Sequence, residues 1–310
     1  MGAHPGPPRR PTSLSGTGAA MVLGCYLLWG FFPLYFKLLD AAGAMEIIGH
    51  RITWTLVTCL ALVALLHRWD RLRSVLVRPR LVGSLCLSAA LVTVNWSVYV
   101  YGVNTGRTAD AALGYFINPL VTVALAGLVL RERLRPAQWA AIALASFAVL
   151  VLVVMQGSLP WISLALAFSF GLYALVKKRV AGQVDALTGL TVESGAVLPL
   201  ALGYLAWLSV TGASGLQGPG AGTALVLLLL GAGPVTAVPL LLFAAGTRRV
   251  PLTVVGLSQY IAPIIQFLLA WAVFGEHIST WRWVSMVLVW SAVAVFAADV
   301  LLQASRGPRA

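Results

Sequence analysis

Long apolar stretches alternate with short polar segments along nearly the whole chain. Each apolar stretch is about 20 residues long, which is the length an α-helix needs to cross the hydrocarbon core of a bilayer. The pattern therefore predicts an all-α integral membrane protein with ten membrane-spanning helices. We expect these helices at residues 18–39, 45–66, 80–101, 108–130, 137–154, 160–177, 187–209, 222–244, 252–274 and 281–302.

The composition supports a membrane location and excludes a soluble fold. Hydrophobic residues make up 60% of the chain, charged residues only 10%, and the mean hydropathy is +0.91. A soluble domain carries about 25% charged residues and has no interior large enough to hide this much apolar surface. Residues 1–17 are rich in Pro, Gly, Ser and Arg, so we expect a disordered tail there. The apolar run that follows is too long for the core of a signal peptide and is interpreted as a retained helix.

The net charge of +12 would suit nucleic-acid binding, but the distribution of the charges indicates a membrane topology instead. With the N-terminus in the cytoplasm and the loops on alternating sides, only Lys37, Arg107 and Arg282 fall outside, and Arg51 lies within the second helix. The other 17 of the 21 Lys and Arg residues lie in cytoplasmic segments, as the positive-inside rule requires. We therefore expect both termini in the cytoplasm, with 304–310 as the second tail, and no nucleic-acid partner.

An internal repeat relates the two halves of the chain. At an offset of 144 residues, AALGYFINPL aligns with VGLSQYIAPI without a gap, and the match continues beyond it. The ten predicted helices thus divide into two five-helix units, at residues 18–155 and 156–303. Because five is odd, the second unit should enter the membrane from the opposite side, an arrangement typical of secondary transporters. The matched rare residues are Pro119 with Pro263, Glu132 with Glu276, and Trp139 with Trp283.

The two units also resemble a known family. Each has a glutamate just after its fourth helix, within LRERLRPAQW and FGEHISTWRW, as in the EamA domain of the drug/metabolite transporter superfamily. The stretches LLWGFFPLYFKLL, EIIGHRITW, NWSVYVYGVN, ALGYFINPL and SQYIAPIIQFLLA resemble the RarD branch of that superfamily, over about residues 20–300. The resemblance implies a multi-pass permease of the bacterial inner membrane with a central cavity between two EamA repeats. One departure is Arg131 before Glu132, where the common pattern has the glycine that the second repeat keeps as Gly275.

Ionisable residues inside a membrane are costly, so they usually face a cavity and have a function. Glu46, His50 and Trp54 follow at intervals of four on one face of the second predicted helix. Arg51 lies beside them and can reach inward through its long stem. We interpret Arg51 as binding an anionic group or locking the outer gate, and Glu46 or His50 as carrying a proton. The alternative is an interfacial Glu46 and a structural His50–Arg51 pair. Glu193, in the seventh helix, is the other proton-coupling candidate, with a structural role as its alternative.

Aromatic and amide side chains in other helices complete the candidate site. Such a set suits an amphipathic organic substrate better than an inorganic ion, although aromatic residues are also common anchors at membrane interfaces. The candidate substrate-binding residues are Arg51, Trp54, Asn95, Trp96, Tyr99, Tyr115, Asn118, Tyr173, Gln259 and Tyr260. We expect no cofactor and no metal, because the sequence contains no cluster with metal-ligand spacing.

Two prolines at helix midpoints predict kinks, because proline lacks the N–H that a helix interior uses. Pro119 and Pro263 lie at the middle of the fourth and ninth predicted helices, so each should free the carbonyl four residues earlier, of Tyr115 and of Gln259. Freed carbonyls are tolerated at this depth only against protein or in a wet cavity. We therefore expect a pair of kinks facing a central site, with Asn118 binding local backbone or substrate. A packing kink without ligand contact is the alternative.

Glu132 and Glu276 are expected to accept hydrogen bonds from the free N–H groups that start the fifth and tenth helices. Those two helices carry few polar groups, so we expect them to form a scaffold or a dimer face. The protein would then be a monomer or a homodimer in membrane lipid.

The function that these features favour is a secondary active permease, an exporter of a small organic molecule by alternating access. Proton coupling is a hypothesis that rests on the buried acids. The alternatives are an uncoupled facilitator or channel, or a membrane enzyme. We do not expect an enzyme, because no nucleophile–base pair is visible. The substrate, the transport direction and the coupling ion are not determined by the sequence.

Overall fold

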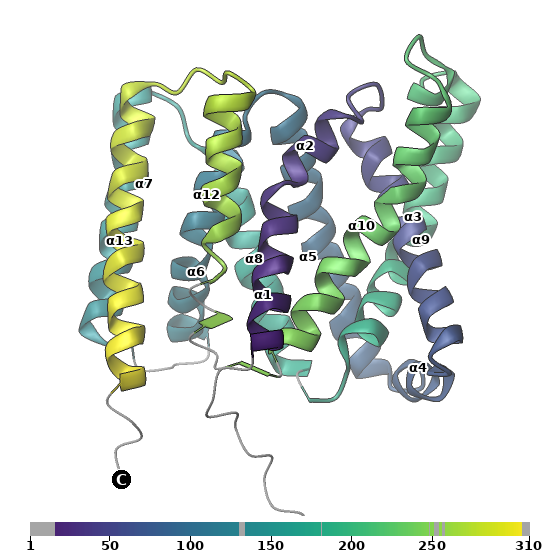
Figure 1. Ribbon diagram of the computed structural model, residues 1–310, viewed down its shortest axis with the longest axis horizontal. Helices are drawn as coiled ribbons and strands as arrows, with labels where there is room; N and C mark the ends of the chain where they lie inside the picture. Colours follow the sequence, from purple (N-terminus) through teal and green to yellow (C-terminus); the bar gives the residue numbers. More distant parts are fainter. Residues whose placement is uncertain are drawn as a thin grey trace, which may run out of the picture.

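The computed structural model describes residues 16–129, 134–180, 182–247, 249–250, 254–255 and 258–305. Within these residues the chain is helical and contains no strand, and Figure 1 shows most of the helices running side by side from the lower to the upper edge. The predicted all-α class is confirmed. Eight helices are long and apolar enough to cross a membrane, and two shorter apolar helices cover Trp161–Lys177 and Ile261–Val273. The count of ten spanning helices therefore stays a prediction.

Prolines mark where several helices of the first half begin. Pro33, Pro79 and Pro136 each lie in the first turn of a helix, where a backbone N–H has no helical acceptor and proline is tolerated. The first predicted helix is consequently two, separated at Phe31, and not the single run expected from its hydropathy. The helices of the first half are α1 (Gly16–Gly30), α2 (Phe32–Lys37), α3 (Ala44–Leu65), α4 (Trp69–Leu76), α5 (Pro79–Asn104), α6 (Thr108–Val129) and α7 (Pro136–Gln156).

The second half begins after α7 ends at Gly157, which adopts a left-handed conformation with φ 66°. Glycine favours this conformation because it has no Cβ to clash. Gly212 ends α9 in the same way, with φ 72°. The helices of the second half are α8 (Trp161–Val180), α9 (Ala186–Thr211), the 3-10 turn η1 (Gly215–Gln217), α10 (Thr223–Thr247), α12 (Ile261–Leu268), the π-helix η2 (Leu269–Val273) and α13 (Thr280–Ser305).

The packing of the helices repeats when the two halves are exchanged. Helices α5 and α6 of the first half pack on α8 of the second half. Their counterparts in the second half, α10 and α12, pack on α1 of the first half. Other contacts join a helix to its own counterpart: α3 to α9, α6 to α12, and α7 to α13. In addition, α3 packs on α10, and its counterpart α9 packs on α5. A structure in which two similar units are related by a two-fold exchange must have contacts of this kind. The packing therefore supports the two-repeat arrangement.

The two halves also run in opposite directions. In Figure 1 α1 begins at the lower edge, where the arginine-rich helix α4 also lies. Its counterpart α8 ends at that edge, because Asp185, just beyond α8, lies 3.6 Å from Arg68 and 3.9 Å from Arg71, which flank or belong to α4. The opposite directions of α1 and α8 agree with an inverted repeat.

Asp185 joins the halves at the lower edge and also starts α9. Its carboxylate accepts hydrogen bonds from the backbone N–H of Thr188, at 3.2 Å, and from the Thr188 hydroxyl, at 2.8 Å. Burial by itself raises the pKa of Asp185, but these hydrogen bonds and the two arginine charges outweigh it and hold the pKa below its usual value. Asp185 is therefore a charged cap of α9 at neutral pH.

The ninth predicted helix differs from the expectation. Gln259 and Tyr260 form a turn, and α12 begins at Ile261, so Pro263 is the third residue of this helix and not its midpoint. The kink at Pro263 stays a prediction, because part of the segment just before α12 lies outside the described residues. In the other half, α6 runs on through Pro119 to Val129. The kink at Pro119 stays a prediction.

Candidate substrate-binding site

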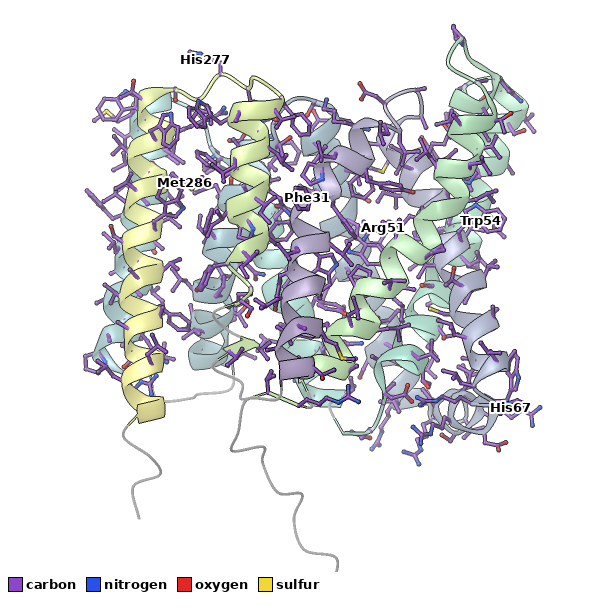
Figure 2. All side chains as sticks on the ribbon, viewed as in Figure 1. Phe31, Arg51, Trp54, His67, His277 and Met286 are labelled. Atoms are coloured by element: carbon purple, nitrogen blue, oxygen red, sulfur yellow. The ribbon has the colours of Figure 1, made fainter. Side chains whose placement is uncertain are left out.

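Arg51 is buried between the two halves. It projects from α3, its side chain is only 4% exposed, and its Nε donates a hydrogen bond of 2.9 Å to the hydroxyl of Thr236 on α10. In the part of the chain that the structure describes, no carboxylate lies within 4 Å of the guanidinium. Figure 2 shows Arg51 pointing into the bundle, among helices of both halves. A positive charge without an acidic partner thus lies inside the protein.

Aromatic rings take the place of that missing partner. The guanidinium carbon lies 3.9 Å from the centre of the Trp96 ring, 5.5 Å from that of Phe36 and 5.7 Å from that of Phe32. Cations are attracted to the faces of such rings, by about 2 kcal/mol or more where water is excluded. The rings of Phe32 and Phe36 on α2 and of Trp96 on α5 therefore form an aromatic box around Arg51 of α3.

Asn95 organises the side of the box that faces α8. Its amide group donates to the carbonyl of Leu166 and to the hydroxyl of Ser169, each at 3.0 Å, and its oxygen accepts a 3.1 Å hydrogen bond from Tyr115. Tyr99, one turn further along α5, packs its ring 5.5 Å from that of Tyr115. Asn95 therefore uses its side chain to hold α5, α6 and α8 together, and its predicted contact with substrate stays a prediction.

Glu193 lies on α9 and lines the same cavity as Trp96. The carboxylate is 3% exposed, accepts a 2.5 Å hydrogen bond from Ser88 and forms a 2.8 Å ion pair with Lys177. A small cavity, with room for about one water-sized molecule, lies between α3, α5 and α9, and both Trp96 and Glu193 line it. The cavity thus connects the aromatic box with a neutralised ion pair.

Glu46 does not face this cavity. Its two carboxylate oxygens accept hydrogen bonds from the Ser214 hydroxyl, at 2.6 Å, and from the backbone N–H of Gly215, at 2.9 Å. It therefore ties α3 to the start of η1, which gives it a structural contact between the halves. His50 is half-buried, and in the described residues it has no hydrogen bond to Arg51. Both remain proton-coupling candidates only as predictions.

Glu276 does not bind the helix start at which it was expected. The carboxylate accepts hydrogen bonds from the backbone N–H groups of Thr108, at 2.7 Å, and Ala109, at 2.9 Å. It therefore caps α6 of the first half, and the predicted cap of the tenth helix is wrong. The sequence could not reveal this, because the acceptor and its donors lie in different repeats. Glu132 lies outside the described residues.

The remaining predicted residues lie away from the box. Trp54 points toward the right-hand edge of Figure 2, whereas Arg51 points inward. Tyr173 lies beside Lys177, with the ring centre 5.6 Å from the ammonium group, and Tyr260 stacks on Phe116. Two amides complete this set: Asn118, which accepts a 3.3 Å hydrogen bond from Thr122, and Gln259, which is half-buried in the turn before α12.

Reasoning from the sequence missed three polar partners. Thr236, Ser88 and Lys177 bind the charged side chains Arg51 and Glu193. A signal for Thr236 was present, because it lies between the two prolines of α10, Pro234 and Pro239, in an otherwise apolar run. Ser88 and Lys177 have no comparable signal, because serine is common in membrane helices and Lys177 also satisfies the positive-inside pattern.

Two related helical units around a polar, aromatic-lined centre define a membrane transport protein built from repeats. The EamA-like transporter family matches the chain twice, over residues 16–154 and 159–298, and the chain belongs to that family. The expected resemblance is thereby confirmed, as is the location in the bacterial inner membrane as a multi-pass protein. The residue limits of the two predicted units stay predictions.

Several known proteins are similar to this chain over most of its length. Protein RarD of Streptomyces exfoliatus is 45% identical, over 94% of this chain and 91% of the relative. Protein RarD of Escherichia coli K12 is 40% identical, over 92% of this chain and 95% of the relative. A solved crystal structure superposes with a TM-score of 0.57 at 19% identity, over 90% of this chain and 96% of that one, and shows the same fold.

Proposed function

We propose that this protein is a secondary active permease that exports a small organic molecule by alternating access. The observation that carries the proposal is the buried Arg51, whose side chain is held by Thr236 of the second half and covered by Trp96 of the first. A binding group shared by both halves is affected whenever the halves move against each other, which is what alternating access requires. The family membership supports transport, and the direction of export is part of the proposal.

The aromatic box suits an organic substrate. A cation lined by rings and apolar side chains offers one polar anchor and a large apolar surface, the combination common in sites for small organic molecules. An inorganic ion would instead need several converging polar ligands. The cavity beside the box is lined mostly by apolar groups, among them Ile52, Val92 and Val197.

Export can be tested without knowing the substrate. Strains that overproduce the wild-type protein or Arg51→Gln at equal membrane levels are compared with a deletion strain by analysis of the small molecules in the medium. We expect at least one organic solute to accumulate outside only with the wild-type protein, because Arg51→Gln removes the charged anchor. Equal media from all three strains would contradict the proposal.

An uncoupled facilitator is the second candidate, and the buried acids favour it. Glu193 is already bound by Lys177 and Ser88, and Glu46 by Ser214 and Gly215, so both carboxylates have structural partners. The two candidates differ in their response to a pH gradient across liposomes that contain the purified protein. A coupled permease concentrates its solute when a gradient is imposed, whereas a facilitator only equilibrates it.

The proton-coupling residues can be tested in the same liposomes. If Glu193 or Glu46 carries the proton, replacement by Gln should leave exchange of solute intact but abolish accumulation driven by the gradient. Accumulation that survives both Glu46→Gln and Glu193→Gln would refute the coupling hypothesis for these residues. Ser88→Ala serves as the control for a change beside Glu193 that keeps the carboxylate.

A further inference from the structure

We propose that the site at Arg51 binds an organic monoanion, with its carboxylate on the guanidinium and its apolar body along the ring of Trp96. This proposal rests on the proposed transport function and names its substrate class. Four observations support it: the charge balance of the buried groups, the unpaired N–H donors of Arg51, the planar shape of its guanidinium and the apolar lining of the cavity.

The charge balance of the buried groups is uneven. Of the buried acids among the described residues, Glu46 accepts hydrogen bonds, and Glu193, Asp110 and Asp299 are each paired with a cation. Arg51 is as deeply buried, yet its single hydrogen-bond partner among the described residues is the neutral Thr236. A buried charge without a counter-charge is strongly destabilising, and the rings around Arg51 offset only part of that cost. A bound anion would supply what the protein itself lacks.

Hydrogen-bond donors without partners at Arg51 also favour a bound anion. Arginine carries five N–H donors, and only Nε of Arg51 has a partner in the described part of the chain. The terminal nitrogens form the planar fork that binds a carboxylate through two parallel hydrogen bonds. The hydroxyl of Tyr99 is also buried without a hydrogen-bond partner, and its ring packs 5.9 Å from that of Phe36, which itself lies against Arg51. One fork and one hydroxyl near the box are thus without hydrogen-bond partners among the described residues.

The charged groups near Arg51 indicate the charge of the ligand. A phosphate dianion would be matched by more than one cation, but Arg51 is the one cation of the box in the described residues. The other nearby cation, Lys177, is already paired with Glu193. That pair also leaves no free negative charge in the cavity for an ammonium group. A carboxylate with one negative charge and no amino group therefore fits better than a phosphate, an amine or a zwitterion.

The position of Trp96 and the lining of the adjacent cavity favour a ligand whose remaining part, beyond the carboxylate, is apolar. Trp96 covers one face of the guanidinium and also lines the cavity between α3, α5 and α9, so a ligand bound at the edge of Arg51 would extend along this ring. The cavity wall beyond it is formed by Ala89, Val92 and Val197. An aromatic or branched carboxylate would extend its apolar body along Trp96 toward this wall, and its carboxylate would stay at the guanidinium.

The experiment compares matched ligands on the full-length protein purified in detergent. Phenylacetate, phenylacetamide, phenethylamine and phenylalanine share one ring and differ in charge, and a series of carboxylates from propionate to indole-3-acetate varies the body. Thermal-unfolding midpoints are measured for every ligand at equal concentration. We expect the midpoint to rise with apolar carboxylates and not with the amide, the amine or the zwitterion, because a ligand that binds the folded state stabilises it.

Variants assign the effect to Arg51. A charged hydrogen-bonded pair contributes about 1.5–3 kcal/mol, so Arg51→Gln should weaken carboxylate binding about 10- to 100-fold. Arg51→Lys keeps the charge without the fork and should bind with intermediate strength. Arg73→Gln, at an exposed arginine of α4, removes the same charge elsewhere and should bind as the wild type does. The ligand comparison on the wild-type protein needs no variant, so it decides the matter even if Arg51→Gln does not fold.

Three results would overturn the proposal: equal stabilisation by the amide or the amine, carboxylate binding that survives Arg51→Gln, or no binding by any carboxylate of the series. Flux measurements in liposomes separate this failure from that of the proposed function. If carboxylates bind but no solute crosses the membrane, the transport proposal fails and the substrate class stands. If neutral solutes cross and carboxylates neither bind nor cross, transport stands and the substrate class falls.

Discussion

The ion pair between Lys177 and Glu193 should contribute strongly to stability, and a double-mutant cycle measures how much. It joins α8 to α9 and lies beside the cavity, with side-chain exposures of 31% for Lys177 and 3% for Glu193. The cycle consists of Lys177→Met, Glu193→Gln and the double variant. Methionine keeps the volume of the lysine stem and glutamine keeps the shape of the carboxylate, so the variants remove charge and little packing.

The expected magnitude follows from the geometry. At 2.8 Å, and with an effective dielectric constant of about 20, the attraction between the two charges is roughly 6 kcal/mol before the cost of taking them out of water. That cost and the partial exposure of Lys177 reduce the net coupling to about 1.5–3 kcal/mol. Lys177→Met should lose more, about 3 kcal/mol, because it leaves a buried carboxylate with only Ser88 as a partner.

Unfolding in mixed micelles of a mild detergent and a denaturing one gives the free energy of unfolding for each variant. The double variant should be more stable than the sum of the single losses predicts, by the coupling energy. Additive losses within about 0.5 kcal/mol would refute the reasoning, because they would mean that the two charges do not interact in the folded protein. The same measurement on Ser88→Ala shows how much of the effect belongs to the hydroxyl.

The remaining predictions concern three other contacts, each measured by unfolding under the same conditions. Glu276→Gln should cost about 1–2 kcal/mol, because an amide cannot accept both N–H groups at the start of α6 and carries no charge there; an unchanged stability would contradict the cap. The lowered pKa of Asp185 gives a contribution that is complete above about pH 4 and is lost as the pH falls through that pKa, so the advantage of the wild type over Asp185→Asn should shrink in acid. Gly233→Ala should lose about 1–3 kcal/mol, because the new Cβ would lie 2.2 Å from the backbone oxygen of Trp54, whereas Gly231→Ala, with its nearest atom at 3.7 Å, should lose nothing.

Sequence patterns predicted the features that depend on local composition. Apolar runs of about 20 residues are set by bilayer thickness, so the helices could be placed, with two errors at Phe31 and at Tyr260. Both errors come from breaks in the backbone that hydropathy does not register: Pro33 starts a new helix after Phe31, and a turn at Tyr260 puts Pro263 into the first turn of α12. The repeat was visible because two copies of one unit keep equivalent residues at one offset.

The sequence by itself determined that this is a helical membrane protein of two repeats, and that the acids and Arg51 lie within the apolar region. Only the tertiary structure decided what those groups bind. Arg51 meets Thr236, Glu193 meets Ser88, and Glu276 meets the start of α6, each across more than 100 residues of chain. Helical periodicity orders residues within one helix. It says nothing of which helices meet, because in a membrane the lipid-facing and protein-facing sides are both apolar and the sequence does not mark the side that turns inward.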